Sequence, residues 1–402
     1  MKRLMILFMF FASCLLAAWE PFLALTLQRN MTDQVQYVMP ERPLNITSVY
    51  RVETGQPFHI ETAFILKEKA AKKISFTGSL KLIAPDGKVS EIFSNRDCGW
   101  VKAGDGGIFI APFQVIVSFE KSDKKGKYRI ELTMKDDSGN AKVTSREIEF
   151  VDSCVDRTPM DEKGFNRFLN FYYRDPQPGR IFAAWDYYLT TAVVKQKEKE
   201  GRNFNPSAVL LGFCEILKVN PQYHDEFAAM SRQAAVENHA YYAFIFAGLG
   251  KDFLKKYAGV INPDILTLVK RLDGADPFAL KEITQAYQLD MLWIKFMVTG
   301  EFEPIRLLCK ELRKRPVMSL EEAKKRHESG KELTAEERVK LNNQLLQFAA
   351  VWSLQSNLRQ GHILAAFYME TILARKLYTD DQEAVLIKFV FKNLNSKKGS
   401  GK

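Results

Sequence analysis

Apolar and polar residues alternate along residues 44–152, the pattern expected of short strands that each bury one face. About seven runs show this alternation, and turn residues such as Pro85-Asp86-Gly87 separate them. The runs cover residues 45–52, 58–66, 74–83, 89–94, 108–120, 128–136 and 143–151. Short strands at this spacing predict a β-sandwich over residues 44–152.

The hairpin over residues 126–151 has the clearest pattern. Tyr128 and Met134 bound a set of alternate apolar residues that should face inward, whereas Arg129, Glu131 and Thr133 should face water. The hairpin resembles the last hairpin of immunoglobulin-like and fibronectin-like domains, with Tyr128 where such domains keep a corner tyrosine. The resemblance implies an immunoglobulin-like sandwich and identifies no ligand.

The period changes after residue 152. Over residues 160–395 apolar residues recur every three or four positions, which predicts amphipathic helices. Ser319 to Glu322 and Thr334 to Glu337 have the sequence of a capping box, so a helix should begin at each. The charged segment between them should be a solvated helix and loop. We therefore predict an all-α helical array over 160–395, followed by a disordered tail over 396–402.

The chain begins with Lys2 and Arg3, followed by an uncharged, mostly apolar run over residues 4–19. This pattern is typical of a secretory signal, and we interpret residues 1–18 as a signal peptide or, if it is retained, an anchor. Cys14 follows a sequence similar to a lipoprotein motif, so lipidation is a further alternative. Residues 19–43 are interpreted as a linker. We expect an exported protein, periplasmic or associated with the outer side of the inner membrane.

Composition narrows the class of protein. The 402 residues are 46% hydrophobic and 26% charged, which excludes long disorder, collagen and a small disulfide scaffold. The 58 basic residues outnumber the 48 acidic ones, giving a formal charge of +10. Acidic residues interrupt the lysine-rich stretches, so no nucleic-acid partner is predicted. The excess charge favours an anionic membrane surface instead.

Four cysteines follow the signal-like run. Cys214 and Cys309 lie in apolar helical stretches and should behave as small hydrophobic residues. Cys98 and Cys154 lie in polar connections, where they would either pair in an oxidising compartment or remain free thiols. No cysteine and histidine cluster has the spacing of a metal site, so neither a metal nor another cofactor is predicted.

Motifs for catalysis are missing from the sequence. No two of the five histidines lie three to five residues apart, and no G-x-S-x-G sequence is present. Gly248 and Gly250 precede Lys251, but the serine or threonine of a phosphate-binding loop does not follow. We therefore assign no catalytic residue and favour a protein without enzymatic activity.

One aromatic segment, residues 168–188, surrounds a proline-rich turn and supplies the candidate binding residues. These are Tyr172, Tyr173, Arg174, Arg180 and Trp185. Aromatic faces and arginines together could hold a peptide, a glycan or a lipid headgroup. The alternative interpretation is a rigid corner between two helices, with the tyrosines in the core.

Four sequence landmarks occur in order along residues 165–365. They are FLNFYYRDPQP, NPSAVLLGFCEILKVNPQYHDEF, LDMLWIKFMVTGEFEPIRLL and AAVWSLQSN, the last followed by His362. Together they resemble an uncharacterised family of exported bacterial α-helical proteins. The resemblance implies a helical domain in the cell envelope and transfers no catalytic residue.

These observations predict an exported cell-envelope binding or assembly protein without catalytic activity. Its partner would be another envelope protein or the membrane surface, and the sequence does not determine the oligomeric state. One alternative is a hydrolase or lyase that acts on an envelope polymer, with acidic and tyrosine side chains meeting in a helical cleft. Another is that the sandwich itself binds a ligand, as in adhesins.

Overall fold

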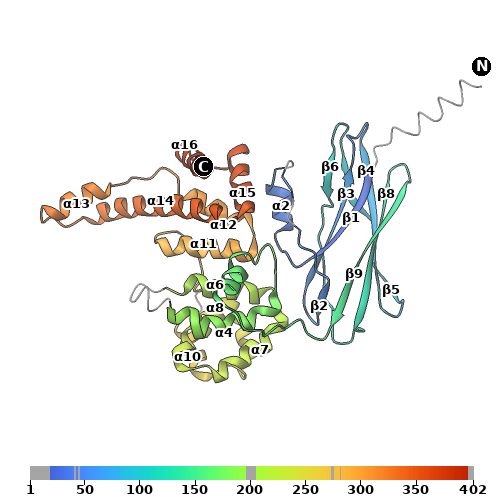
Figure 1. Ribbon diagram of the computed structural model, residues 1–402, viewed down its shortest axis with the longest axis horizontal. Helices are drawn as coiled ribbons and strands as arrows, with labels where there is room; N and C mark the ends of the chain where they lie inside the picture. Colours follow the sequence, from blue (N-terminus) through green and yellow to red (C-terminus); the bar gives the residue numbers. More distant parts are fainter. Residues whose placement is uncertain are drawn as a thin grey trace, which may run out of the picture. The chain divides into compact units, whose positions relative to one another are not determined.

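A computed structural model of the chain describes residues 19–39, 42–43, 46–195, 205–272, 276–280 and 282–396. The chain divides into two compact units (Figure 1). Unit 1 comprises Met1–Gln28 and Asn45–Cys154, and unit 2 comprises Arg29–Leu44 and Val155–Lys402. The described strands belong to unit 1 and the described helices to unit 2, which confirms a fold of mixed β and α structure. The predicted signal peptide and residues 397–402 of the predicted tail lie outside the described residues.

The described residues of unit 1 form two β-sheets. The strands are β1 (Trp19–Thr26), β2 (Arg51–Glu53), β3 (Phe58–Leu66), β4 (Ile74–Ile83), β5 (Val89–Val101), β6 (Gly107–Ile110), β7 (Val115–Val117), β8 (Gly126–Asp136) and β9 (Ala141–Val151). One sheet has the order β1-β3-β6, with β7 also paired to β3, and the other has the order β2-β9-β8-β4-β5. The pairing is antiparallel except between β2 and β9.

Both sheets contribute to one hydrophobic core. Phe64 of β3 stacks on Phe76 of β4, with ring centroids 3.9 Å apart, and Phe119 stacks on Phe150 of β9. Along β8 the predicted inward face, from Tyr128 to Met134 at alternate positions, is buried. This burial confirms the inward-facing positions predicted from the alternation of the hairpin.

Two predicted boundaries in this part of the chain are wrong. Residues 19–43 are not a linker, because Trp19–Thr26 form β1, which pairs with β3 from His59 to Leu66, and Met31–Tyr37 form helix α2 of unit 2. The run predicted over 108–120 is two strands, β6 and β7. Pro112 lies between them, and its ring nitrogen has no hydrogen to donate to a neighbouring strand.

Unit 2 is built from helices. Besides α2 (Met31–Tyr37), the α-helices given for its described residues are α3 (Glu162–Asn170), α4 (Ile181–Tyr187), α6 (Ser207–Lys218), α7 (His224–Met230), α8 (His239–Leu249), α9 (Lys251–Tyr257), α10 (Pro263–Arg271), α11 (Ala286–Thr299), α12 (Phe302–Lys310), α13 (Leu320–Glu328), α14 (Ala335–Arg359), α15 (Ile363–Ala374) and α16 (Asp381–Ser396). Short turns of other helix types include η1 (Pro178–Arg180) and η2 (Tyr188–Ala192).

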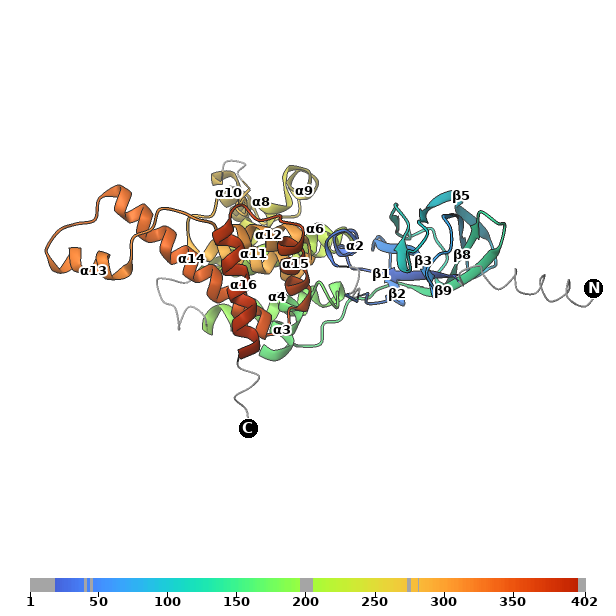
Figure 2. The ribbon, with the colours of Figure 1, turned by 90° about the horizontal axis from the view of Figure 1, so that it is seen from above.

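Local sequence signals set several of these helix ends. Ser319 and Thr334 each form the predicted capping box, so α13 and α14 begin where the sequence indicates. Asn262 caps α10, and Pro263 occupies its first turn. The charged segment before α14 is the exposed helix α13, which with the start of α14 projects from the rest of unit 2 (Figure 2). Among the described residues, no helix combines the length and apolar character needed to cross a membrane.

Candidate functional site

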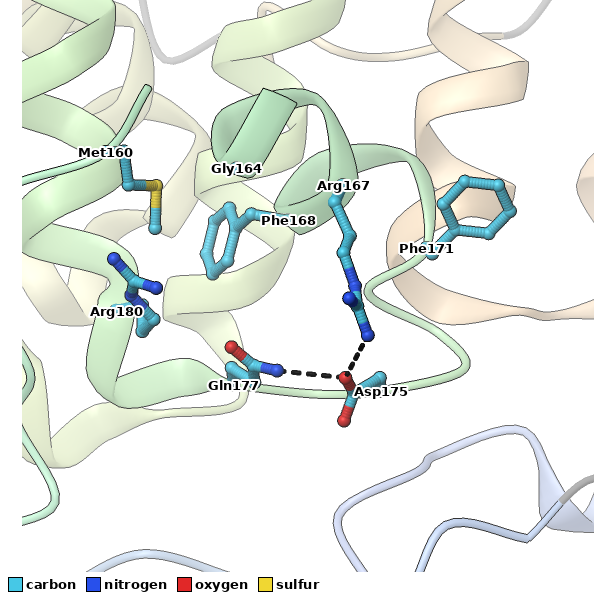
Figure 3. Close-up of a pocket in the computed structure, with 8 residues that line it drawn as sticks. All are labelled: Met160, Gly164, Arg167, Phe168, Phe171, Asp175, Gln177 and Arg180. Atoms are coloured by element: carbon cyan, nitrogen blue, oxygen red, sulfur yellow. Dashed lines mark hydrogen bonds and ion pairs between the residues drawn. The ribbon is translucent and has the colours of Figure 1, made fainter. Parts of the chain in front are cut away.

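A cavity of about 330 Å³ lies at the corner where α3 leads into α4 (Figure 3). Its walls combine two arginines and two smaller polar side chains with an apolar surface. The lining residues are Met160, Gly164, Arg167, Phe168, Phe171, Asp175, Gln177 and Arg180. A volume near 300 Å³ is at the small end of ligand sites, so the cavity suits a small molecule or one terminal group of a larger one.

The chain forms this corner through local caps and turns. Asp161 accepts a hydrogen bond from the Gly164 backbone N–H at 2.7 Å and so fixes the start of α3. After α3 the chain turns, and Pro178 starts the short helix η1, which runs directly into α4. The Asp156 backbone N–H donates to the carbonyl of Gly179 at 3.0 Å, which ties the segment before α3 to η1.

One side of the cavity is a small polar network. Asp175 Oδ2 accepts a hydrogen bond from Gln177 Nε2 at 2.9 Å and lies 3.6 Å from the Arg167 guanidinium. Figure 3 shows Arg167 extending from α3 toward Asp175. Arg167 is largely exposed, so its ion pair is solvated and readily exchanged for a ligand anion.

Arg180 lies across the cavity on the other side of Phe168 (Figure 3). Its guanidinium donates to the Thr158 carbonyl at 2.9 Å, and its Nε lies 3.3 Å from a carboxylate oxygen of Asp156. That Nε is buried and has no hydrogen-bond partner among the described residues. Hydrogen bonds from Thr158, together with Arg180, lower the pKa of Asp156, so this carboxylate stays ionised and holds Arg180 in place.

Aromatic side chains form the apolar part of the site. Phe168 is buried at the base, between the two arginines, and its ring meets that of Tyr172 edge to face at 5.4 Å. Phe171 lines the cavity and stacks on His362 at 4.8 Å between ring centroids. The arrangement places guanidinium groups beside an apolar surface, which suits a ligand that joins an anionic group to an apolar one.

His362 is a residue that the sequence did not identify as unusual. It is fully buried among the rings of Phe171, Tyr173, Trp293 and Phe296. Neither ring nitrogen has a hydrogen-bond partner among the described residues, and burial lowers the pKa of the imidazole to about 4. His362 is therefore neutral at physiological pH and acts as an aromatic packing element behind Phe171.

The structure corrects the binding prediction for three of the five candidate residues. Tyr172, Tyr173 and Trp185 are buried in the core of unit 2, where a ligand on the surface does not reach them. Trp185 Nε1 donates to the Tyr242 hydroxyl at 2.8 Å, and burial raises the pKa of Tyr173 to about 12. For these side chains the alternative of a packed helix corner describes the structure.

The two candidate arginines have different positions. Arg180 lines the cavity, as described above, whereas Arg174 is exposed and does not line it. The remaining lining residues, in particular Arg167 and Gln177, were not identified from the sequence. The signal that could have found Arg167 is its position one turn before Phe171 on the polar face of α3, beside the turn with Asp175.

Cys98 and Cys154 are free thiols, as are Cys214 and Cys309. Strand register excludes a bond between the first two. Cys98 of β5 lies near the Asp136 end of the five-stranded sheet, and Cys154 follows β9 near the Gly126 end. Strand β8 joins these ends and has 11 residues, about 33 Å at the usual rise, far beyond the reach of a disulfide.

A second cavity, of about 420 Å³, lies beside α13 and the start of α14. Its carboxylates, Glu322 and Glu337, are the capping-box residues, and their hydrogen bonds to Ser319 and Thr334 lower the pKa of each. Their position is explained by helix capping. Across the described residues, no group of three or more histidine, cysteine and acidic side chains could hold a metal ion.

The arrangement at the α3–α4 cavity is suited to binding. Among its described lining residues Asp175 is the one carboxylate, and it is engaged by Arg167 and Gln177. The predicted meeting of acidic and tyrosine side chains in a helical cleft does not occur there, because Tyr172 and Tyr173 are in the core. Arg167 and Arg180, each beside one carboxylate, are the positively charged residues among the described lining.

Comparison with protein-family models and with curated proteins finds no match. Solved structures give partial matches of low similarity. The sporulation control protein Spo0M from Bacillus subtilis is 12% identical, with a TM-score of 0.20, over 35% of this chain and 51% of Spo0M. A superoxide reductase (neelaredoxin) from Ignicoccus hospitalis is 13% identical, with a TM-score of 0.16, over 25% of this chain and 74% of the reductase.

A family 123 glycoside hydrolase from Clostridium perfringens is 9% identical, with a TM-score of 0.21, over 45% of this chain and 36% of the hydrolase. The chain thus spans about half the length of Spo0M and about a third of the hydrolase. TM-scores this low carry no argument about fold or function, so the function is argued from the site alone.

Proposed function

We propose that this chain is an exported cell-envelope binding protein whose helical unit holds an anionic, partly apolar ligand in the α3–α4 cavity. The observation that carries the proposal is the placement of Arg167 and Arg180 on opposite sides of the buried Phe168 ring. Guanidinium groups bind carboxylates and phosphates in bidentate fashion, and the aromatic base contacts the apolar part of the ligand.

Export rests on the sequence of residues 1–18, with its basic start and apolar run. The location we propose is the periplasm or the outer side of the inner membrane. We also propose that residues 165–365 belong to the family of exported bacterial α-helical proteins that their landmarks resemble. In this proposal the helical unit is an all-α array. The ligand would then be part of an envelope protein or polymer that ends in an acidic group.

For unit 1 we propose an immunoglobulin-like sandwich that serves as a scaffold. The Tyr128 hydroxyl donates to the Lys124 carbonyl at 2.8 Å, four residues upstream, as a corner tyrosine does. The predominantly antiparallel sheets and the shared core also agree with this fold.

A matched pair of small probes tests the binding proposal. N-acetyl-leucine carries a carboxylate beside an apolar side chain, and N-acetyl-leucinamide has the same shape without the charge. Isothermal titration of the full chain should show binding of the acid and at least roughly tenfold weaker binding of the amide, because hydrogen bonds to charged groups contribute about 1.5–3 kcal/mol. Equal affinity for acid and amide, or no binding of either, would contradict the proposal.

The alternative, a hydrolase or lyase, requires a second titratable group beside Asp175. In the described part of the chain the cavity supplies arginines in that position, which favour holding a ligand over cleaving it. Turnover of an envelope polymer by the purified chain, abolished by Asp175→Asn, would support the enzyme instead.

A further inference from the structure

One end of unit 1 is basic and carries an exposed tryptophan. The β3–β4 loop, residues 67–73, lies beside the β5–β6 loop, residues 102–106. The Ala70 backbone N–H donates to the Asp105 carbonyl at 2.8 Å, and the Gly104 N–H donates to the Ala70 carbonyl at 2.7 Å. We call this region the basic end; its charged and aromatic residues are Lys67, Glu68, Lys69, Lys72, Lys73, Trp100, Lys102 and Asp105.

The lysines of the basic end are largely unneutralised. Residues 67–73 contain four lysines and one glutamate, a formal charge of +3. Lys67 pairs with Glu20 at 2.6 Å, and the Asp105 carboxylate accepts a hydrogen bond from the Lys102 backbone. For Lys69, Lys72, Lys73 and Lys102 the described residues place no carboxylate within ion-pair distance, and all four side chains are exposed.

The aspartates of the neighbouring β8–β9 turn accept hydrogen bonds from nearby residues. Asp136 accepts hydrogen bonds from Ser138 and Asn140, and Asp137 accepts one from the Ser75 backbone. The β8–β9 turn, residues 135–142, has two lysines and two aspartates and adds no net charge. Residues 102–106, with one lysine and one aspartate, are also neutral overall, so the positive charge of residues 67–73 determines the sign of the field at this end.

Trp100 gives the basic end an apolar contact. Its side chain is 49% exposed, and the ammonium groups of Lys73 and Lys102 lie 4.7 and 5.9 Å from the ring centroid. Ile108, at the start of β6, is 56% exposed. Tryptophan flanked by lysines is enriched at the boundary between water and a lipid bilayer, where the ring enters the headgroup layer and the ammonium groups meet phosphates.

The apolar N-terminal run joins the molecule at the same end. Trp19, the first described residue, pairs with Leu66, next to Lys67, and Glu20 forms the ion pair with Lys67. The 18 preceding residues contain the uncharged run that begins at Leu4. A membrane that holds this run would therefore lie at the basic end of unit 1.

We propose that the basic end of unit 1 docks on the surface of an anionic lipid bilayer. Lysines 69, 72, 73 and 102 meet lipid phosphates, and Trp100 enters the interface. Charge complementarity and the attachment point of the N-terminal run both identify the bilayer as the occupant. The inference concerns unit 1 and is independent of the ligand cavity in unit 2.

The test compares two variants of equal charge in the full chain. K69E/K72E/K73E reverses three lysines of the basic end, and K121E/K124E/K127E reverses three exposed lysines at the opposite end of the same unit, near the start of β8. Hydrogen exchange of residues 67–73 and 102–107 is measured with vesicles of phosphatidylglycerol and phosphatidylcholine, and with phosphatidylcholine alone. Exchange along β8 and β9 reports that both variants are folded.

We expect anionic vesicles to slow exchange in both loops of the wild type and of K121E/K124E/K127E more than pure phosphatidylcholine vesicles do. K69E/K72E/K73E should lose this protection, because three reversed lysines weaken docking roughly hundredfold or more. Brominated lipid should quench wild-type tryptophan fluorescence more than that of W100F. Equal protection in the two triple variants, no protection in the wild type, or equal quenching in W100F would overturn the proposal.

Discussion

At the scale of single residues, His362 shows how burial fixes a protonation state. The imidazole is enclosed by aromatic rings, and desolvation alone lowers its pKa to about 4. No charged group contributes to this shift. In the unfolded chain the same imidazole has a pKa near 6.5. As the pH falls below 6.5, the unfolded state therefore binds a proton while the folded state stays neutral until the pH approaches 4.

The stability of unit 2 should therefore decrease as the pH is lowered from about 6.5 to about 4, by up to about 3 kcal/mol from His362. His362→Phe keeps the stack on Phe171 and removes the titration, so its stability should vary less over this window. Denaturant unfolding followed by helical circular dichroism measures unit 2, because the described helices lie there. Identical pH profiles for the two proteins would contradict this assignment.

The cysteines give a second prediction at this scale. Burial raises the pKa of Cys98 and Cys154 to about 11, and the sheet register holds them apart. The native chain should show no link between them and should react slowly with alkylating reagents near pH 8, whereas the unfolded chain should react at both. Peptide mapping by mass spectrometry without reduction checks this; a Cys98–Cys154 peptide pair would refute it.

At the scale of elements, the position of helix α2 depends on one glycine of unit 2, Gly300. Gly300 ends α11 with a φ of 67°, and its carbonyl accepts hydrogen bonds from Tyr368 Oη at 2.9 Å and Asn30 Nδ2 at 3.3 Å. A Cβ at Gly300 would lie 2.9 Å from Tyr173 Cβ and closer still to Asn30. Asn30 directly precedes α2, so this close approach helps to hold α2 against the end of α11.

Gly300→Ala should destabilise unit 2 more than Gly330→Ala does. Gly330 also has a positive φ, of 70°, but open space where a Cβ would be, so it controls for backbone strain. The difference should be about 1–3 kcal/mol, the usual cost of forcing an extra carbon into a packed site. Equal free energies of unfolding for the two variants would contradict this, because they would mean that Asn30 and Tyr173 move aside for the added carbon without loss of stability.

Sequence periodicity predicted those strands and helices well that bury one face and expose the other to solvent. Strands β3, β4, β8 and β9 and the capped starts of α13 and α14 follow this rule. It failed for β1, because WEPFLALT continues the apolar run before it and shows no alternation. It failed for α2 because a short helix is stabilised by packing against α12 and α15, which a local pattern does not report.

At the scale of the whole molecule, the segment predicted from the sequence contains the α3–α4 cavity, but three of its five candidate side chains are buried in the core. Apolar stripes and aromatic clusters mark the core as readily as a binding surface, so Tyr172 and Trp185 looked like ligand contacts and are packing residues. Arg180 was identified because it flanks the proline-rich turn. Arg167 was missed because its approach to the cavity depends on how the turn after α3 folds back, which is a tertiary property.

The central claim is that the α3–α4 cavity binds an anionic ligand through its arginines. The most direct measurement is titration of N-acetyl-leucine into the full-length wild type, Arg167→Gln and the matched control Arg174→Gln, which removes an exposed arginine of the same turn outside the cavity. We predict equal affinity for wild type and Arg174→Gln and at least roughly tenfold weaker binding by Arg167→Gln. Equal binding by all three, or binding lost equally in both variants, would contradict the account.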